Sequence, residues 1–219
     1  MEKKNKPYPV DNELKEVYVA KEPPADYGIN NSIRYTYADY MSWMDKQRRE
    51  LIDGVVYKLM TAPSRFHADI SSELLAIFKW FVKKRKGKCK VYHAPFDVRF
   101  PKNGETANEK IDTVVQPDIC VICDPNKLDD AGCIGAPDLI VEVQSPSTAR
   151  RDLMEKFDLY EQAGVKEYWV VSPSDKSLRV YTLQEDGKYD PGATYAFTGK
   201  VPVGIFKGLE IDLKELFEY

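Results

Sequence analysis

Two short apolar runs in the middle of the chain, residues 116–122 and 137–144, carry acidic side chains among aliphatic and β-branched residues. Turn-forming residues, mainly aspartate, glycine and proline, bound both runs, and their lengths are typical of buried strands. Successive side chains of a strand point to opposite faces, so Glu142 and Gln144 share a face about 6 to 7 Å apart. If the two strands are neighbours, Asp118 and Glu142 converge.

A helical pattern of apolar positions precedes these strands. Between residues 64 and 86 the apolar side chains recur at spacings of three and four, at Ile70, Leu74, Ile77, Phe78 and Phe81. This spacing predicts an amphipathic helix of about six turns. His67 falls near its start and on its inner stripe, where a histidine is either a hydrogen-bonded core residue or a side chain that lines a site.

A second helix is predicted after the acidic strands. Residues 145–148 stop the strand and offer helix caps, and residues 149–163 have apolar positions at a helical spacing. Asp152, Lys156 and Tyr160 then lie along one side of this helix, one turn apart. Lys156 would reach back to the strand ends, and Asp152 would tether it.

The remaining pattern predicts shorter elements and, with them, the fold class. They are a helix at 37–46 capped by Thr36, a hairpin at 49–60 that turns at Asp53-Gly54, strands at 90–100, 168–173, 177–183 and 188–198, and a helix at 211–217. The alternation predicts an α/β fold: a mixed central β-sheet flanked by helices, with peripheral β-hairpins. Residues 1–30 are polar and without periodicity, so we expect an extended N-terminal arm before a single domain at 31–219.

Composition agrees with one globular domain. The chain has 219 residues, of which 43% are hydrophobic and 31% charged, enough for one substantial core. No apolar run reaches the roughly 20 residues that span a bilayer. The first residues are charged without a following hydrophobic stretch, which predicts a cytoplasmic protein with no membrane association and with reduced cysteines.

Four cysteines raise a zinc interpretation. Cys120 and Cys123 have the spacing of a zinc-binding pair, and Cys89 and Cys133 are the other two. Zinc ligands of this spacing sit in turns, whereas Cys120 and Cys123 fall on a predicted strand and face opposite sides of it. Small buried hydrophobic residues are therefore the favoured interpretation.

The charge balance limits the kind of nucleic-acid contact. A net charge of −3 and a pI of about 5.6 argue against a general nucleic-acid coat, because phosphate binding depends largely on lysine and arginine. A basic run at residues 83–90 nevertheless closes the first long helix. It is either a solvated helix end whose cations complement the dipole or a contact for the phosphate backbone.

The paired carboxylates are the strongest chemical signal. A carboxylate buried in a strand is costly unless it is paired or bound to a metal. Two of them on adjacent strands indicate a hard cation such as magnesium, which takes few protein carboxylates and fills its other positions with water and phosphate oxygens. The alternative is structural: Asp118 as a turn acid after Pro117, and Glu142 as a member of a buried ion pair.

At these residues the chain resembles the PD-(D/E)XK nuclease superfamily, whose motif is an aspartate at one strand start and an acidic-x-lysine triplet on the next strand. Gln144 stands where that motif has lysine, and Lys156 on the following helix is the natural substitute. The blocks at 50–56, 62–67, 94–98 and 164–169 resemble more specifically the bacterial Uma-two family of restriction-endonuclease-like proteins. This resemblance spans roughly residues 35 to 185.

The resemblance implies an endonuclease that hydrolyses phosphodiester bonds of nucleic acid and uses Mg²⁺ or Mn²⁺ as its cofactor. DNA is the favoured substrate. A homodimer is compatible with this, because cutting a duplex often needs two sites. The implied ion ligands are Asp118, Glu142 and the Val143 carbonyl, and Lys156 would orient the attacking water or stabilise charge on the phosphate. Gln144 would fix the water or Lys156, Glu50 would add an outer carboxylate, and His67 would line the site.

Two other functions stay open at this point. The first is a nucleic-acid-binding or regulatory module on a nuclease scaffold that has lost turnover, and Gln144 in place of lysine keeps it open. The second is an assembly partner of a mobile element or defence system, and the sequence of one chain does not test that function. Metal-dependent cleavage that is lost when Glu142 is changed would separate the nuclease from the binding module.

Overall fold

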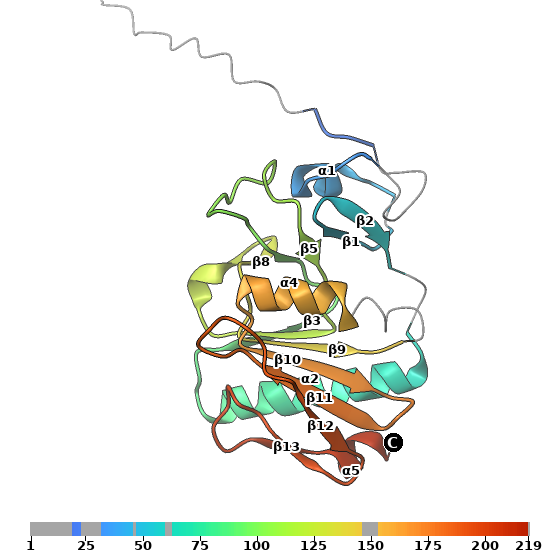
Figure 1. Cartoon of the computed structure of the whole chain (residues 1–219), viewed down its shortest axis with the longest axis vertical. Coiled ribbons are helices and arrows are strands. Elements are labelled where there is room, and N and C mark those ends of the chain that lie inside the picture. The colour runs from blue at the N-terminus through green and yellow to red at the C-terminus, as the bar shows by residue number, and fades with distance from the viewer. Residues whose placement is uncertain (1–18, 23–31, 46, 60–62, 146–152, 219) are drawn as a thin grey trace, which may run out of the picture.

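The computed structural model describes residues 19–22, 32–45, 47–59, 63–145 and 153–218. Within them the strands form two six-stranded sheets and one two-stranded sheet (Figure 1). The first sheet contains β1 (Arg49–Ile52), β2 (Val55–Lys58), β4 (Val98–Arg99), β5 (Val114–Val115), β7 (Leu128–Asp129) and β8 (Gly132–Ile134). The second contains β3 (Lys90–His93), β6 (Ile119–Ile122), β9 (Leu139–Val143), β10 (Glu167–Ser172), β11 (Ser177–Thr182) and β12 (Ala193–Ala196).

Both six-stranded sheets are mixed. The first has the order β2-β1-β5-β4-β8-β7, and only its β4–β8 pair is parallel among the described strands. The second has the order β12-β11-β10-β9-β6-β3, with β9 and β10 parallel and its other pairs antiparallel. The predicted mixed α/β class is therefore confirmed, but the single central sheet is wrong. The strands of the first sheet that are only two or three residues long have no readable periodicity.

Two helices cover opposite faces of the second sheet (Figure 1). The helix α2 (Arg65–Lys84) begins after Ser64, whose hydroxyl accepts from the backbone N–H of His67, and its spacing was predicted correctly. The helix α4 (Glu155–Ala163) ends at Gly164, which adopts the left-handed conformation at φ +84° that favours glycine. Residues 146–152, including the predicted tether Asp152, lie outside the described part of the chain.

The hairpin of β1 and β2 turns where the sequence predicts. Asp53 and Gly54 both have positive φ, at 52° and 74°. A Cβ atom at Gly54 would lie 3.0 Å from side-chain atoms of Arg34, so the turn needs glycine for space as well as for conformation. The register of this hairpin places Glu50 opposite Tyr57.

Several predicted boundaries need correction. The strand expected at 90–100 divides into β3 and β4, which belong to different sheets, because Pro95 cannot donate to a strand ladder. The helix α1 (Tyr37–Ser42) is capped by Thr36 as predicted but ends four residues early. The expected C-terminal helix becomes β14 (Glu210–Asp212) followed by α5 (Leu213–Phe217), and β14 pairs with β13 (Lys200–Pro202).

Of the expected N-terminal arm, the described part of the chain contains residues 19–22. The backbone N–H of Lys21 donates to Asp39 Oδ1 at 2.6 Å, and Trp43 Nε1 donates to the Lys21 carbonyl at 2.7 Å. The rest of the expected arm lies outside the described residues. Among the helices of the described ranges, none is both long and apolar enough to cross a membrane.

Candidate active site

Asp118 and Glu142 lie side by side at one end of the second sheet. Strands β6 and β9 are antiparallel neighbours in which Ile119 opposes Val141, so the next step of the register sets Asp118 opposite Glu142. Asp118 Oδ2 accepts the backbone N–H of Val143 at 2.8 Å, which ties this carboxylate to the strand that carries Glu142. The strands are therefore neighbours, as convergence of the two carboxylates requires.

Glu142 is almost fully buried and accepts hydrogen bonds from two side chains of α4. Its Oε1 atom accepts hydrogen bonds from Lys156 Nζ at 2.8 Å and from the Tyr160 hydroxyl at 2.7 Å. Burial raises the pKa of Tyr160 well above its ordinary value, and the charge of Glu142 raises it further. The hydroxyl therefore remains protonated and acts as a donor to the carboxylate.

Glu50 reaches the same ammonium group from the first sheet. It is fully buried on β1, and its Oε1 lies 2.9 Å from Lys156 Nζ. The same oxygen accepts the backbone N–H of Gln116 at 2.9 Å. Lys156 thus bridges carboxylates of two different sheets, and the structure brings the predicted Glu50, Glu142 and Lys156 together.

His67 adjoins the other carboxylate. It lies in the first turn of α2, and its Nε2 atom is 3.1 Å from Asp118 Oδ2. The two side chains are 13% and 21% exposed, so they are the more accessible part of the cluster. Of the two sequence-based interpretations of His67, this position supports the one in which it lines the site.

Gln144 directly follows β9, two residues beyond Glu142. Its backbone N–H donates to the Val171 carbonyl at 2.8 Å, in continuation of the β9–β10 ladder. Its side-chain nitrogen Nε2 is buried and has no hydrogen-bond partner in the described part of the chain. The amide N–H₂ group of Gln144 is therefore a buried hydrogen-bond donor without a described acceptor, two residues from Glu142.

Comparisons with known proteins place the chain in a family. The model of the Uma2 family, described as "Putative restriction endonuclease", matches residues 37–214. This chain belongs to that family. An uncharacterized protein of Synechocystis is 30% identical over 154 residues, which cover 69% of this chain and 75% of the relative. The fold is similar to that of a crystal structure from Anabaena variabilis, which is described as a putative nuclease belonging to DUF820. The two structures superpose with a TM-score of 0.65 at 20% identity, over 83% of this chain and 97% of that one.

In this Uma2 chain two further residues contact the polar cluster although sequence reasoning gave them no role. Tyr160 bonds Glu142, and the four-residue spacing from Lys156 is the signal that could have identified it. Gln116 donates from its backbone to Glu50 and from Nε2 to Asp97 at 2.9 Å. The second contact joins elements far apart in sequence, so no local pattern reveals it.

Two of the cysteines do not match the predicted reduced state. Cys89 and Cys123 form a disulfide at the end of the β3–β6 ladder, one step beyond the pairing of Lys90 with Ile122. Cys120 and Cys133 are buried free thiols, as expected for small hydrophobic residues. The disulfide removes two of the four sulfurs that the zinc interpretation would use.

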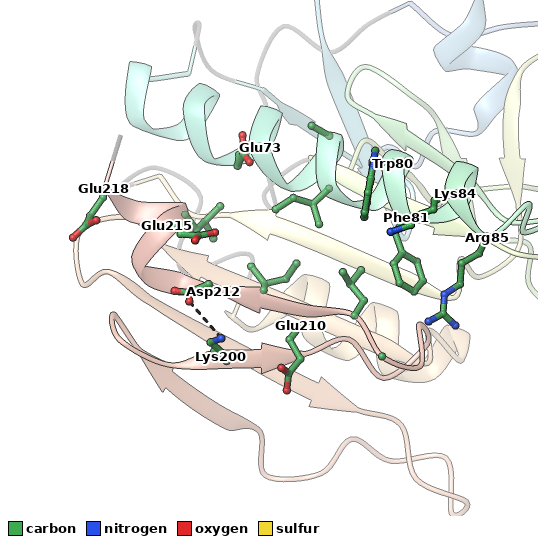
Figure 2. Close-up of a pocket in the computed structure, with 16 residues that line it drawn as sticks. Glu73, Trp80, Phe81, Lys84, Arg85, Lys200, Glu210, Asp212, Glu215 and Glu218 are labelled. Carbon is green, nitrogen blue, oxygen red and sulfur yellow. Dashed lines mark ion pairs between the residues drawn. The ribbon is translucent and has the colours of Figure 1, made fainter.

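One groove of the described surface lies away from the carboxylates. It has a volume of about 1270 Å³ and runs between α2 and the segment from β13 to α5. Figure 2 shows acidic side chains such as Glu215 and Glu218 toward one end and Lys84 and Arg85 at the other. The two cations belong to the basic run, which therefore lies at the opposite end of α2 from His67.

Proposed function

We propose that this chain is a metal-dependent endonuclease that hydrolyses phosphodiester bonds of nucleic acid, with DNA as the favoured substrate. The observation that carries the proposal is the pairing of Asp118 with Glu142 on neighbouring strands, with the Lys156 ammonium on Glu142. The family's description as a restriction endonuclease and the fold shared with the Anabaena protein, which is described as a nuclease, point the same way.

The oxygen donors of the site fit a hard divalent cation. No three histidine, cysteine or acidic side chains gather into a metal cluster within the described ranges. Mg²⁺, however, takes only one or two protein carboxylates and keeps several waters. His67 and Val143 both bond Asp118 through Oδ2, and Oδ1 accepts no hydrogen bond from the described residues. Asp118, Glu142 and the Val143 carbonyl would hold Mg²⁺ or Mn²⁺, which would supply phosphate polarisation and a lowered pKa of bound water.

The side chains around the carboxylates have separate tasks in this proposal. His67 holds Asp118 in place, since its Nε2 lies 3.1 Å from Oδ2. Lys156 would stabilise the negative charge that develops on the phosphate oxygens, because a fixed ammonium in a buried site acts strongly on nearby charge. The unmet Nε2 donor of Gln144 would bond a water molecule or a phosphate oxygen. Glu50 holds Lys156 close to the site in the absence of substrate.

The alternative is a nucleic-acid-binding module that has lost turnover. One observation favours it: the Lys156 side chain is only 5% exposed and lies against two carboxylates. To act on a phosphate, its ammonium must exchange one of these contacts. If it cannot, the cluster is a buried ion pair that joins the two sheets.

Cleavage assays on two site variants test the proposal. The native chain is incubated with single- and double-stranded DNA and RNA and with Mn²⁺ or Mg²⁺, beside Glu142→Gln and Lys156→Gln. We expect metal-dependent products from the native chain and a loss on the order of a hundredfold or more in Lys156→Gln, as for removal of a charge-stabilising group. Glu142→Gln should lose cleavage and Mn²⁺ binding together.

Asp138→Asn is the matched control. Asp138 precedes β9 and has the parity of Glu142, but its carboxylate bonds the Cys123 N–H and Lys166 instead of the cluster. Circular dichroism checks that each variant is folded. Native protein that binds Mn²⁺ in calorimetry and binds nucleic acid, yet cleaves none of the substrates, would support the binding module.

A further inference from the structure

One oxygen atom of Glu142 receives both donors of α4. Lys156 Nζ and the Tyr160 hydroxyl meet Oε1 at 2.8 and 2.7 Å. The two residues are four positions apart, so they project from the same face of the helix in consecutive turns. A single catalytic lysine does not require a second donor on the same oxygen, which raises the question of what Tyr160 adds.

The two donors differ in how firmly they are held. The Tyr160 ring is fully buried between other aromatic rings: it meets Tyr168 edge-on at 5.0 Å and Phe100 at 6.0 Å between ring centroids. Its hydroxyl cannot move without repacking that cluster. Lys156 has a long unbranched side chain and two carboxylates within 2.9 Å of Nζ, so its ammonium can leave one carboxylate while keeping the other.

We infer that Tyr160 is a positioning residue that holds the Glu142 carboxylate in the orientation needed to bind the metal ion, while Lys156 is the donor that turns to the substrate. This rests on the proposed nuclease function. The bond from Tyr160 occupies Oε1 whether or not Lys156 has moved. Glu142 therefore keeps its direction at the step in which the ammonium engages the phosphate.

The division of tasks predicts that only the Tyr160 variant loses Mn²⁺ affinity, although both variants lose cleavage. Tyr160→Phe keeps the ring and removes only the hydroxyl, so Mn²⁺ affinity should fall about 10- to 100-fold, as when the partner that orients a metal ligand is removed. kcat should fall at a fixed Mn²⁺ concentration, with KM for the nucleic acid unchanged. Lys156→Gln should keep Mn²⁺ affinity within a few fold and lose cleavage.

Tyr189→Phe is the matched control. Tyr189 is a buried tyrosine of the same aromatic cluster, and its hydroxyl donates to the Val165 carbonyl at 2.9 Å instead of to Glu142. Both tyrosine variants lose one buried hydrogen bond, so both should lower Tm. Only Tyr160→Phe should weaken Mn²⁺ binding, measured by calorimetry without nucleic acid.

The outcomes separate this inference from the proposed function. If the native chain binds Mn²⁺ and cleaves, and Tyr160→Phe binds Mn²⁺ as tightly as Tyr189→Phe does, the positioning role is overturned and the nuclease stands. If the native chain neither binds Mn²⁺ nor cleaves, the proposed function fails and the inference fails with it. If the native chain cleaves and Mn²⁺ binding is weaker in Tyr160→Phe but not in Tyr189→Phe, the inference and the proposed function are both supported.

Discussion

Both faces of the second sheet are buried, but the side chains that they present differ in chemistry. On the α2 side, β9 presents only apolar side chains, Leu139, Val141 and Val143. On the α4 side, the same β9 strand presents Glu142 beneath Lys156 and Tyr160. Alternating side chains of one strand thus serve a hydrophobic core on one face and a charged cluster on the other.

This difference indicates where stability and chemistry reside. Apolar burial stabilises the fold in proportion to the area removed from water. A buried ion pair adds little net stability, because the cost of removing its charges from water offsets their attraction. Changes on the α2 side should therefore act on unfolding, and changes on the α4 side should act on metal binding and cleavage.

The largest expected effect on stability comes from Phe78, the fully buried ring of α2 that meets Trp169 edge-on at 5.9 Å. Phe78→Ala should lower the free energy of unfolding by about 3–5 kcal/mol, because it leaves a cavity as well as removing apolar contact. Urea denaturation measures this loss. The cleavage rate per folded molecule should stay near that of the native chain.

Phe78→Leu serves as the milder control and should cost less, since leucine fills most of the same space. The comparison of the two faces would break down if the folded fraction of Phe78→Ala lost cleavage as Glu142→Gln does. In that case the α2 face would take part in the chemistry of the site.

The residues that the sequence predicted well are those whose signal is local. The spacing of Ile70, Leu74 and Phe78 located α2 almost to its ends, because a period of 3.6 needs no tertiary information. Strand parity placed Glu142 correctly with respect to Asp118 once the two strands were assumed to be neighbours. The same kind of reasoning found the turn at Asp53-Gly54.

The parts that could not be predicted depend on contacts between distant segments. Glu50 joins the cluster from another sheet, and nothing in its own strand indicates that Lys156 is its partner. Division into two sheets depends on β4 and β5, which have two residues each and therefore no alternation to read. The disulfide requires the β3–β6 register, which brings together Cys89 and Cys123 across 34 positions.

That disulfide gives the second prediction, a smaller effect on the α2 side. Cys89 and Cys123 pack against the same apolar core as Phe78. The double variant Cys89→Ser with Cys123→Ser should lower the free energy of unfolding by about 2–4 kcal/mol, because the unfolded chain regains the freedom of the closed loop. Denaturation of the native chain with and without dithiothreitol should show a similar difference.

Dithiothreitol should have no effect on the stability of the double variant, which lacks the disulfide. This control distinguishes reduction of the disulfide from other effects of the reagent. Cleavage by the folded double variant should equal that of the native chain. An equal urea midpoint for the oxidised and reduced native chain would show that the bond does not stabilise this face.

At neutral pH the smallest effect concerns Cys133, a buried thiol of the α4 side, because its contribution to stability changes only at high pH. Burial raises the pKa of Cys133 from 9.0 to about 12, so at pH 8 its thiolate is about a thousandfold scarcer than in an unfolded chain. A thiol whose pKa is raised by folding stabilises the native state below pH 9 and loses that contribution as pH rises toward 12.

Labelling of Cys133 with iodoacetamide at pH 8 should therefore be slow in native protein and fast in urea. Cys133→Ala should reduce the loss of stability at alkaline pH. Rapid labelling of native Cys133 would mean that the α4 side opens far more readily than the apolar face beneath α2.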